Sequence, residues 1–231
     1  MLEELKLRVY KANLSLVKQG LVFQNWGNAS AIDRKLGLLV IKPSGVDYDV
    51  MEPEDMVVVD MNTGKVVEGN FRPSSDTPTH IELYKAHQSI GGIVHTHSIN
   101  ATAFAQAGMS IKAIGTTHAD YFDGDILCTR SLTKEEVCND YEKNTGHVIN
   151  ETIGKKNPLL VPSILVKNHG PFSWGETIED AVYHAVVLEQ VAEMYFKTLL
   201  LNPHTSMEKY ILVKHFNRKH GPDAYYGQRK K

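Results

Sequence analysis

Short apolar runs rich in valine and isoleucine are spread along this chain, and they limit its fold more than any other feature. Runs at 38–41, 56–61, 66–67 and 163–167 predict strands, and the run at 91–97 predicts a buried strand that ends at two histidines. Runs of this length, bounded by turn residues, are typical of the strands of a sheet.

The segments between these runs carry apolar residues at helical spacing. Helices are predicted at 2–20, 77–87, 101–107, 134–152, 177–201 and 206–219. Gly146 is expected to interrupt the fourth of them, and residues 115–121 are predicted to form a loop. Because no repeat or linker-like tract divides the sequence, residues 1–231 are predicted to form a single α/β domain. We expect a central, mainly antiparallel β-sheet flanked by helices.

Composition excludes several classes of protein. The chain is 42% hydrophobic and 23% charged, with a formal net charge of −2 and one basic run, Arg229-Lys230-Lys231, so nucleic acid is not an expected partner. No stretch approaches about 18 uncharged apolar residues, so no membrane span is expected. The chain does not start like a signal peptide, and Cys128 and Cys138 are expected to be reduced thiols. We therefore expect a cytoplasmic protein.

Three histidines carry the clearest signal of chemistry. His95 and His97 are two residues apart on a predicted strand, so both imidazoles point to one side. Such a pair alone is also compatible with an exposed strand face. His169 follows another predicted strand, which Gly170-Pro171 is expected to stop. Three histidines at strand ends match a catalytic zinc site, which keeps one coordination position open.

Two loop segments are candidates for binding an anion. Lys42–Gly45 offers a cation, a hydroxyl and a glycine amide in one turn, and Ser74–Pro78 opens a helix, where free N–H groups favour a phosphate. Taken singly, each segment is explained better by a structural role, an ordinary turn for the first and plain N-capping for the second. Gly170–Gly175 has the glycine spacing of a nucleotide-binding loop, but Glu176 stands where lysine is required, so a nucleotide is not expected.

Six motifs together resemble one family. They are Lys42–Gly45, Ser74–His80, Gly92–His97, Gly115–Tyr121, His169–Phe172 and Lys219–Gln228. In this order, and over nearly the whole chain, they resemble the L-ribulose-5-phosphate 4-epimerases, a branch of the class II aldolase family. The His-x-His motif is shared with the wider family, whereas Thr-Thr-His-Ala-Asp-Tyr and Tyr-Tyr-Gly-Gln are typical of the epimerases.

The resemblance implies a complete active site. The implied metal ligands are His95, His97 and His169, with Asp76 beside the metal. The implied phosphate and substrate contacts are Asn28, Lys42, Ser44, Gly45, Ser74, Ser75, Thr116, Glu142, His215 and Arg218. Asp120 and Tyr226 are implied as the acid/base pair. Neither would be chosen from composition, because loop aspartates and terminal tyrosines usually have structural roles.

The resemblance also implies the class II aldolase fold, a divalent metal and a phosphorylated pentulose substrate. Zn²⁺ is the expected metal, with Mn²⁺ or Co²⁺ as alternatives, and the pathway would be one such as arabinose or ascorbate catabolism. A homo-oligomer is implied, a cyclic tetramer whose active sites are shared between subunits. Tyr226 adds a reason of its own, since it lies five residues from the chain end and needs docking to act. We expect the tail to dock on an adjacent subunit, with docking on its own domain as the alternative.

The chemistry of the implied reaction explains these groups. The C4 hydrogen of a pentulose phosphate is not acidic, because C4 is not adjacent to the carbonyl. Cleavage of C3–C4 instead gives a dihydroxyacetone enediolate and glycolaldehyde phosphate, which rotates before the bond re-forms. A divalent metal suits the charge on the enediolate. One group must accept the C4 hydroxyl proton on cleavage, and another must donate a proton when the bond re-forms.

Two rival functions follow from the same residues. A class II aldolase, such as a fuculose- or rhamnulose-phosphate aldolase, would share the fold, metal and phosphate site but release its fragments. Asp76 favours the epimerase, because those aldolases carry a glutamate base at this position. A non-catalytic binding module of the adducin type is the second rival, and it should lack the metal ligands that this chain retains.

Overall fold

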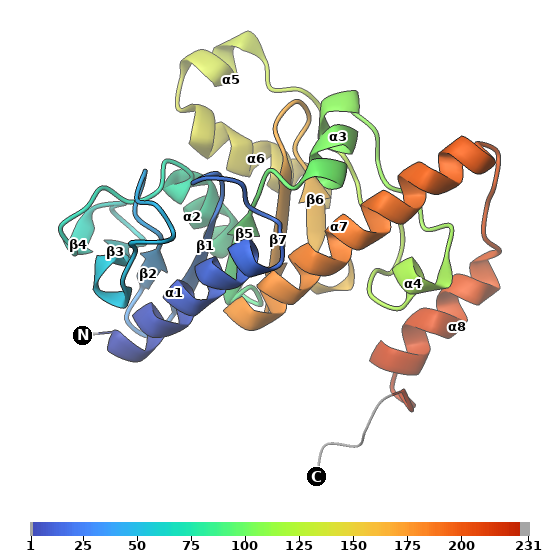
Figure 1. The fold of residues 1–231 in the computed structure, drawn as a ribbon, viewed down its shortest axis with the longest axis horizontal. Helices are drawn as coiled ribbons and strands as arrows, with labels where there is room; N and C mark the ends of the chain where they lie inside the picture. Colours follow the sequence, from blue (N-terminus) through green and yellow to red (C-terminus); the bar gives the residue numbers. More distant parts are fainter. Residues whose placement is uncertain (1, 227–231) are drawn as a thin grey trace.

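Seven strands pair into one sheet in a computed structural model that describes residues 2–226 (Figure 1). The strands are β1 (Asn28–Asp33), β2 (Leu38–Ile41), β3 (Val57–Asp60), β4 (Val66–Glu68), β5 (Gly92–His95), β6 (Ser163–Leu165) and β7 (Pro171–Gly175). Their spatial order is β4-β3-β2-β1-β5-β7-β6, and neighbouring strands are antiparallel. The predicted α/β class and the antiparallel sheet are confirmed.

Helices precede, connect and follow these strands. The α-helices are α1 (Glu3–Lys18), α2 (Thr77–Ala86), α3 (Ile99–Ala107), α4 (Thr116–Ala119), α5 (Lys134–Cys138), α6 (Tyr141–Ile153), α7 (Ile178–Leu201) and α8 (Lys209–His220). Single 3₁₀ turns cover Pro53–Asp55 and Pro158–Leu160. Within residues 2–226, no helix combines the length and apolar character needed to cross a membrane. Cys128 and Cys138 are free thiols.

Alternating side chains on the central strands divide the core into two layers. Val40 and Val58 pack on one face of the sheet with apolar residues of α1 and α7. Leu39, Ile41 and Val59 point to the other face, where they meet apolar residues of α2 and α6. Both faces of the sheet are therefore covered, which is why these short strands contain valine and isoleucine at consecutive positions.

α7 and α8 are the last two helices of the chain. α7 begins with a capping box, in which the Thr177 hydroxyl accepts a hydrogen bond from Asp180 N at 3.2 Å, and such a cap stabilises a helix by about 1 kcal/mol. After α7, the chain turns back, and α8 packs on the short helix α4. Figure 1 shows both helices beyond α7, on the side of the molecule away from β2, β3 and β4.

Two strands and one short helix were not predicted from the sequence. β1 was not predicted because its sequence, Asn-Ala-Ser-Ala-Ile-Asp, contains few β-branched residues. β7 begins at Pro171, so Gly170-Pro171 opens a strand instead of only ending one. Proline is tolerated at the first residue of a strand. Residues 116–119 form α4 within the segment predicted as a loop.

The break in the predicted helix 134–152 lies at a different place. α5 ends at Cys138, and Asp140, with φ of 57°, redirects the chain into α6. Gly146 is helical and faces α2, where a Cβ atom would lie 2.7 Å from Glu82 Cβ. The predicted interruption at Gly146 is therefore wrong, because this glycine allows two helices to approach closely.

Candidate active site

Three histidines meet where β5 ends beside the turn from β6 to β7. His95 is the last residue of β5, and His97 lies just beyond the strand. β5 pairs with β7 so that His95 is opposite Phe172, and this register brings His169 next to His95. One ring nitrogen from each histidine lies within 4.8 Å of the other two, a spacing that one metal ion can bridge.

The orientation of the rings fits a metal ion. The Nε2 atoms of His95 and His97 face each other at 3.1 Å. Bonds of about 2.1 Å in a tetrahedral zinc site place ligand atoms roughly 3.4 Å apart, close to this separation. His95 Nδ1 donates to the carbonyl of Pro171 at 2.9 Å, which leaves the lone pair on Nε2. Phe172 stacks on the same ring at 4.2 Å between centroids and holds its orientation.

The protonation state of the three rings suits ligation. Burial lowers the pKa of His95 and of His97, and it lowers the pKa of His169 to about 4. Neighbouring rings add to the effect, because a proton on one imidazole disfavours a proton on the next. The histidines are therefore neutral at pH 7, as metal ligation requires.

Asp76 lies beside this cluster at the N-cap of α2. Its Oδ2 atom is 4.0 Å from His95 Nε2 and accepts a hydrogen bond from Asn28 Nδ2 at 2.7 Å. Burial alone would raise the pKa of Asp76, but the nearby histidines and Asn28 outweigh it and hold the pKa below its ordinary value. Asn28 Oδ1 is buried without a hydrogen-bond partner among the described residues, so it can accept a hydrogen bond from a ligand.

The two predicted anion-binding loops lie side by side. Ser74 N donates to Lys42 O at 3.0 Å, and Ser44 N donates to Arg72 O at 2.9 Å. Lys42 Nζ donates to the carbonyls of Val46 at 2.7 Å and Pro43 at 3.2 Å, so it braces the first loop from within. Burial lowers the pKa of Lys42 to about 8.

One pocket of about 470 Å³ unites the histidines with these loops. Its lining residues are Asn25, Trp26, Gly27, Asn28, Lys42, Pro43, Ser44, Gly45, Ser74, Ser75, Asp76, His95, His97 and His169. A wider hollow of about 700 Å³ beside the start of α1 contains none of these residues. Volume alone therefore does not mark the site. The smaller pocket has the size of a small-molecule site and the convergent polar groups expected of one.

A second polar cluster surrounds Asp120 at the end of α4. Arg218 donates from Nε to Oδ1 at 2.9 Å and from Nη2 to Oδ2 at 2.5 Å. His215 Nδ1 lies 3.0 Å from Oδ1, and His220 Nε2 donates to the Asp120 carbonyl at 2.9 Å. Burial would raise the pKa of Asp120, but the hydrogen bonds from Arg218 and His215 hold it below its ordinary value. Asp120 is therefore a carboxylate at neutral pH.

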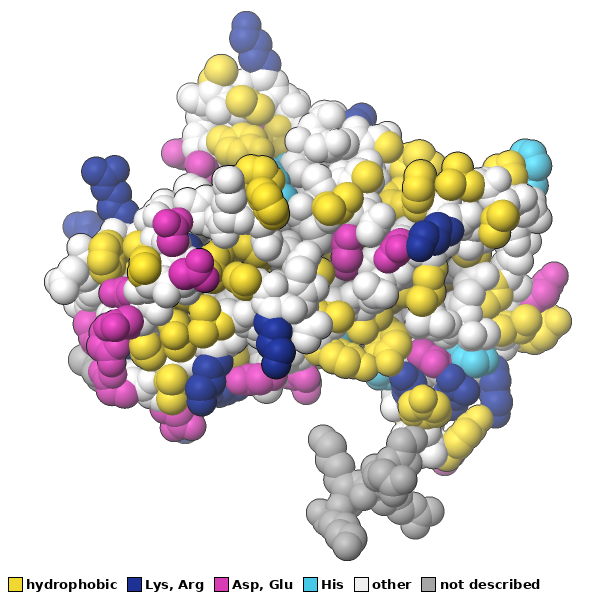
Figure 2. Space-filling view, viewed as in Figure 1, with side chains coloured by type: hydrophobic (Ala, Val, Ile, Leu, Met, Phe, Trp, Pro, Cys, Tyr) yellow, Lys and Arg dark blue, Asp and Glu magenta, His cyan; other side chains and the backbone are white. Residues whose placement is uncertain are grey.

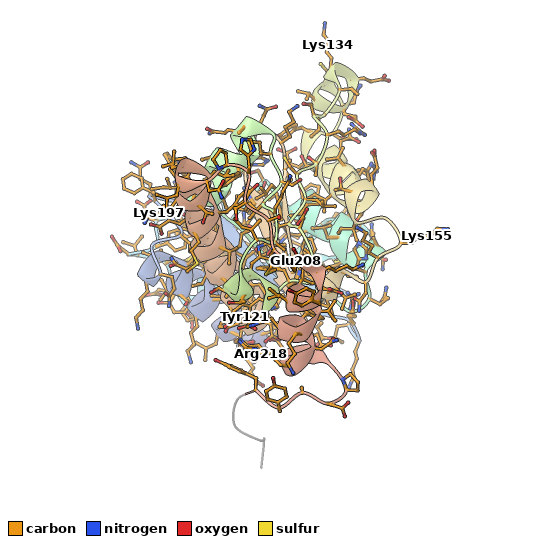
Figure 3. The ribbon with its side chains drawn as sticks, turned by 90° about the vertical axis from the view of Figure 1, so that its right-hand side faces the viewer. Tyr121, Lys134, Lys155, Lys197, Glu208 and Arg218 are labelled. Atoms are coloured by element: carbon orange, nitrogen blue, oxygen red, sulfur yellow. The ribbon has the colours of Figure 1, made fainter. Side chains whose placement is uncertain are left out.

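Tyr226 joins this cluster from the chain end. Its backbone N–H donates to the Arg218 carbonyl at 3.1 Å, and its ring centroid lies 4.5 Å from Lys219 Nζ. Lys219 also covers the ring of Tyr121, which lies close to Arg218 in Figure 3. Figure 2 shows the Lys and Arg side chains gathered around α8. In this chain the tail up to Tyr226 thus packs on its own α8, which is the alternative that the sequence left open.

The two groups of predicted site residues do not meet within one chain. The described residues that line the pocket include none of Thr116, Asp120, His215 and Arg218. Thr116 opens α4, and its backbone carbonyl accepts from Asp120 N at 2.9 Å. Glu142 is not among the described residues that line the pocket, and its backbone carbonyl on α6 accepts from the Thr79 hydroxyl of α2 at 2.5 Å.

Sequence reasoning missed three neighbours of the site. Trp26 lines the pocket, and the Tyr141 hydroxyl lies 3.4 Å from His169 Nδ1. Lys219 lies between Tyr121 and Tyr226. No sequence signal pairs Tyr141 with His169, because they are 28 residues apart on different elements. Trp26, however, stands next to Gly27-Asn28 in a loop-like stretch before a strand, and that context could have marked it.

The sequence of this chain matches a known class of proteins. The sequence pattern of the class II aldolase and adducin N-terminal domain family matches residues 7–196, and the chain belongs to this family.

Solved structures with the same fold confirm the predicted class II aldolase-like architecture. An L-fuculose 1-phosphate aldolase is 24% identical, with a TM-score of 0.78 over 93% of this chain and 95% of that chain. The L-fuculose 1-phosphate aldolase from Glaciozyma antarctica PI12 is 18% identical, with a TM-score of 0.76 over 96% and 84% of the two chains. YgbL from Escherichia coli is 19% identical, with a TM-score of 0.74 over 92% and 97%. At these identities the likeness concerns the fold.

Proposed function

We propose that this protein is an L-ribulose-5-phosphate 4-epimerase, which interconverts L-ribulose 5-phosphate and D-xylulose 5-phosphate by cleaving and re-forming C3–C4. The observation that carries this choice over an aldolase is the side chain at position 76. The resemblance implies a glutamate base at this position in the aldolases, whereas this chain has the shorter Asp76. The Asp76 Oδ2 atom accepts a hydrogen bond from Asn28 Nδ2 at 2.7 Å and lies 4.0 Å from His95 Nε2, so it is held beside the histidines.

The pocket would bind the substrate along its length. The loops at Lys42–Gly45 and Ser74–Ser75 would hold the phosphate, with hydroxyl and backbone N–H groups supplementing the charge of Lys42. Asn28 Oδ1, buried without a partner among the described residues, would accept from a sugar hydroxyl. A divalent ion held by His95, His97 and His169, most simply Zn²⁺, would supply Lewis-acid stabilisation of the charge that C–C cleavage creates.

Asp120 and Tyr226 would exchange protons with the C4 hydroxyl. Both contact Arg218, Asp120 through hydrogen bonds and Tyr226 through its ring. The C4 oxygen of a rotating aldehyde points in two directions in turn, and each of the two groups would serve one of them. A proton-transfer group must come within about 3 Å of its target. Because Asp120 and Arg218 are not among the described residues of the pocket, the pair would act on a substrate bound in a neighbouring subunit.

This separation supports the proposed homo-oligomer. The Asp120 cluster of one subunit would face the histidine pocket of the next. Repeating this one heterologous contact from subunit to subunit would close a ring. A cyclic tetramer satisfies that geometry. The sequence suggested that the tail alone would leave its domain and dock on an adjacent subunit. In this proposal Tyr226 stays on its own α8, and the whole Asp120 cluster faces the active site of the adjacent subunit.

The direct test is an assay of the purified protein with L-ribulose 5-phosphate. The expected result is formation of D-xylulose 5-phosphate without accumulation of dihydroxyacetone. Equimolar release of dihydroxyacetone and glycolaldehyde phosphate would instead identify an aldolase. Absence of turnover with L-ribulose 5-phosphate would leave both rivals, and the metal-loaded protein would then be assayed with L-fuculose 1-phosphate. Absence of turnover with both substrates would favour the non-catalytic binding module, against which the retained histidine cluster argues.

A further inference from the structure

The loop that precedes β1 carries two exposed aromatic side chains at the edge of the pocket. Phe23 is 69% exposed and Trp26 is 50% exposed, with ring centroids 5.8 Å apart. Only Trp26 lines the pocket, and its ring centroid lies 6.5 Å from that of His97. An indole in this position leaves a large apolar surface uncovered beside a site built for a polar ligand.

The backbone of this loop is fixed against the site. Gly27 has φ of +109°, and a Cβ atom there would lie 2.7 Å from the carbonyl oxygen of His95. The Tyr48 hydroxyl donates to the Gly27 carbonyl at 3.0 Å, and the Lys42 ammonium covers the Tyr48 ring at 4.6 Å. The backbone next to Trp26 is therefore in contact with β5, which carries His95, and is linked through Tyr48 to Lys42 of the Lys42–Gly45 loop.

Trp26 is also chemically unlike the rest of the pocket. Among the described lining residues it is the one large apolar side chain, and the others are polar or charged groups, glycines and Pro43. A sugar phosphate is hydroxylated and charged over most of its surface, and its one apolar part is the C–H face of its carbon chain. The one apolar wall and the one apolar part of the ligand are complementary.

We propose that Trp26 is a substrate-contact residue. Its indole packs on the carbon chain of the bound ketose phosphate, and this carbon chain extends from the histidines to the Lys42–Gly45 loop. The identity of the ketose rests on the proposed function, but the contact itself does not. Because the carbon chain is present before and during bond cleavage, this contact stabilises the bound substrate and the transition state alike. Its loss therefore raises KM and leaves kcat nearly unchanged.

The chain provides its own optical probe for this contact. It has two tryptophans, and Trp174 is fully buried in the core, so changes at the pocket are reported by Trp26. The experiment titrates the zinc-loaded protein with L-ribulose 5-phosphate and follows tryptophan emission. A saturable change is expected, and Trp26→Phe is expected to abolish it while calorimetry still detects binding. Emission that stays constant while calorimetry shows saturation would overturn the proposal.

Kinetic variants separate contact from loop folding. Trp26→Ala is expected to raise KM roughly tenfold, in the range for losing an apolar contact, with kcat within about threefold. Phe23→Ala removes a more exposed ring that does not line the pocket, and its KM is expected to stay within about twofold. Equal effects of the two substitutions would overturn the proposal, since loop folding would then explain both.

Failure of the proposed function gives a different result. If L-ribulose 5-phosphate changes the emission of Trp26 but is not turned over, the epimerase assignment fails and the contact stands. If the protein is an active epimerase and Trp26→Ala has an unchanged KM, the epimerase stands and the contact is refuted.

Discussion

Arg218 holds Asp120 with two hydrogen bonds, from Nε to Oδ1 at 2.9 Å and from Nη2 to Oδ2 at 2.5 Å. The pair joins α8 to α4 and keeps the carboxylate ionised, and the same arginine lies 4.7 Å from the ring centroid of Tyr226. The residues proposed to move protons are thus positioned by one cation. Disturbing any member of this group should affect turnover without touching the histidine pocket.

Asp120→Asn and Tyr226→Phe should each lower kcat by about 10²- to 10⁴-fold, the usual contribution of an acid/base group. Metal content should stay at the wild-type value, because neither residue contacts the histidines. Steady-state kinetics with metal analysis checks both expectations. Tyr225→Phe is the matched control, since Tyr225 is 63% exposed and carries the neighbouring phenol. Near-normal turnover in Tyr226→Phe would show that this tyrosine is structural.

Chelation should abolish activity, and Zn²⁺, Mn²⁺ or Co²⁺ should restore it. His97→Asn should weaken metal affinity by more than the roughly 10- to 100-fold cost of disturbing a ligand's supporting contacts, because it removes a ligand itself. Competition with a chromogenic chelator measures this affinity. His204→Asn, in an exposed loop, is the control and should bind metal normally. Full activity in a verified metal-free protein would contradict the proposed chemistry.

Stability of the metal-free protein should fall as pH drops below about 6.5, the ordinary pKa of histidine. Burial lowers the pKa of His80 to about 3 and of His169 to about 4. The unfolded chain therefore binds protons between pH 6.5 and 4 that the folded chain does not, and stability rises with pH in this window. Each histidine contributes a slope of up to about 1.4 kcal/mol per pH unit.

Urea unfolding at fixed protein concentration between pH 7 and pH 4 measures this slope. His80→Gln should reduce the slope, because the substituted side chain does not titrate. His147→Gln, which makes the same substitution at an exposed histidine, is the control. An unchanged slope in His80→Gln would mean that His80 is protonated in the folded protein.

Phosphate binding should weaken as pH rises through about 8, where Lys42 loses its charge. A sugar phosphate is already fully ionised there, since its second pKa is about 6, so the change belongs to the protein. KM should rise above pH 8 while kcat stays level. Lys42→Met should raise KM at pH 7 and remove this rise, whereas Ser75→Ala should raise KM and keep it. A KM that is flat to pH 9 in the wild type would count against this role of Lys42.

The sequence predicted those parts of the fold and site whose signal is local. All five predicted strands were found, because short runs of valine, isoleucine and leucine mark them. β1 and β7 carry alanine, serine, glycine or proline at half or more of their positions, and each of them pairs with a strand on both sides. The pairing of β1 and β7 depends on the neighbouring strands of the sheet, so it cannot be predicted from the local composition of these two segments.

The same limit applies to the site. His95 and His97 are two residues apart in the sequence, so the common orientation of their imidazole rings could be predicted from this spacing alone. Asp120 and Arg218 are 98 residues apart, and only the packing of α8 on α4 brings them together. The separation of this cluster from the histidine pocket was likewise invisible in the sequence, and the proposed sharing of active sites between subunits rests on it.

Shared active sites can be tested by mixing two inactive variants. Asp120→Asn keeps an intact histidine pocket, and His97→Asn keeps an intact Asp120 cluster. After dissociation and random reassembly into rings, about a quarter of the contacts should join an intact pocket to an intact cluster, so about a quarter of the wild-type activity should return. The measurement is turnover of the mixed sample, with mixed rings verified by mass spectrometry of differently tagged chains.

A second mixture supplies the decisive control. Asp120 and Tyr226 lie in the same cluster of one chain, so rings of Asp120→Asn and Tyr226→Phe subunits contain no intact cluster, and no activity should return. Recovery in this second mixture would mean that Tyr226 reaches a neighbour's Asp120 by leaving its own α8. Failure of the first mixture in verified mixed rings would mean that each subunit brings Asp120 to its own histidines, which requires α4 and α8 to move within the chain. A monomer at micromolar concentration that is fully active would exclude sharing altogether.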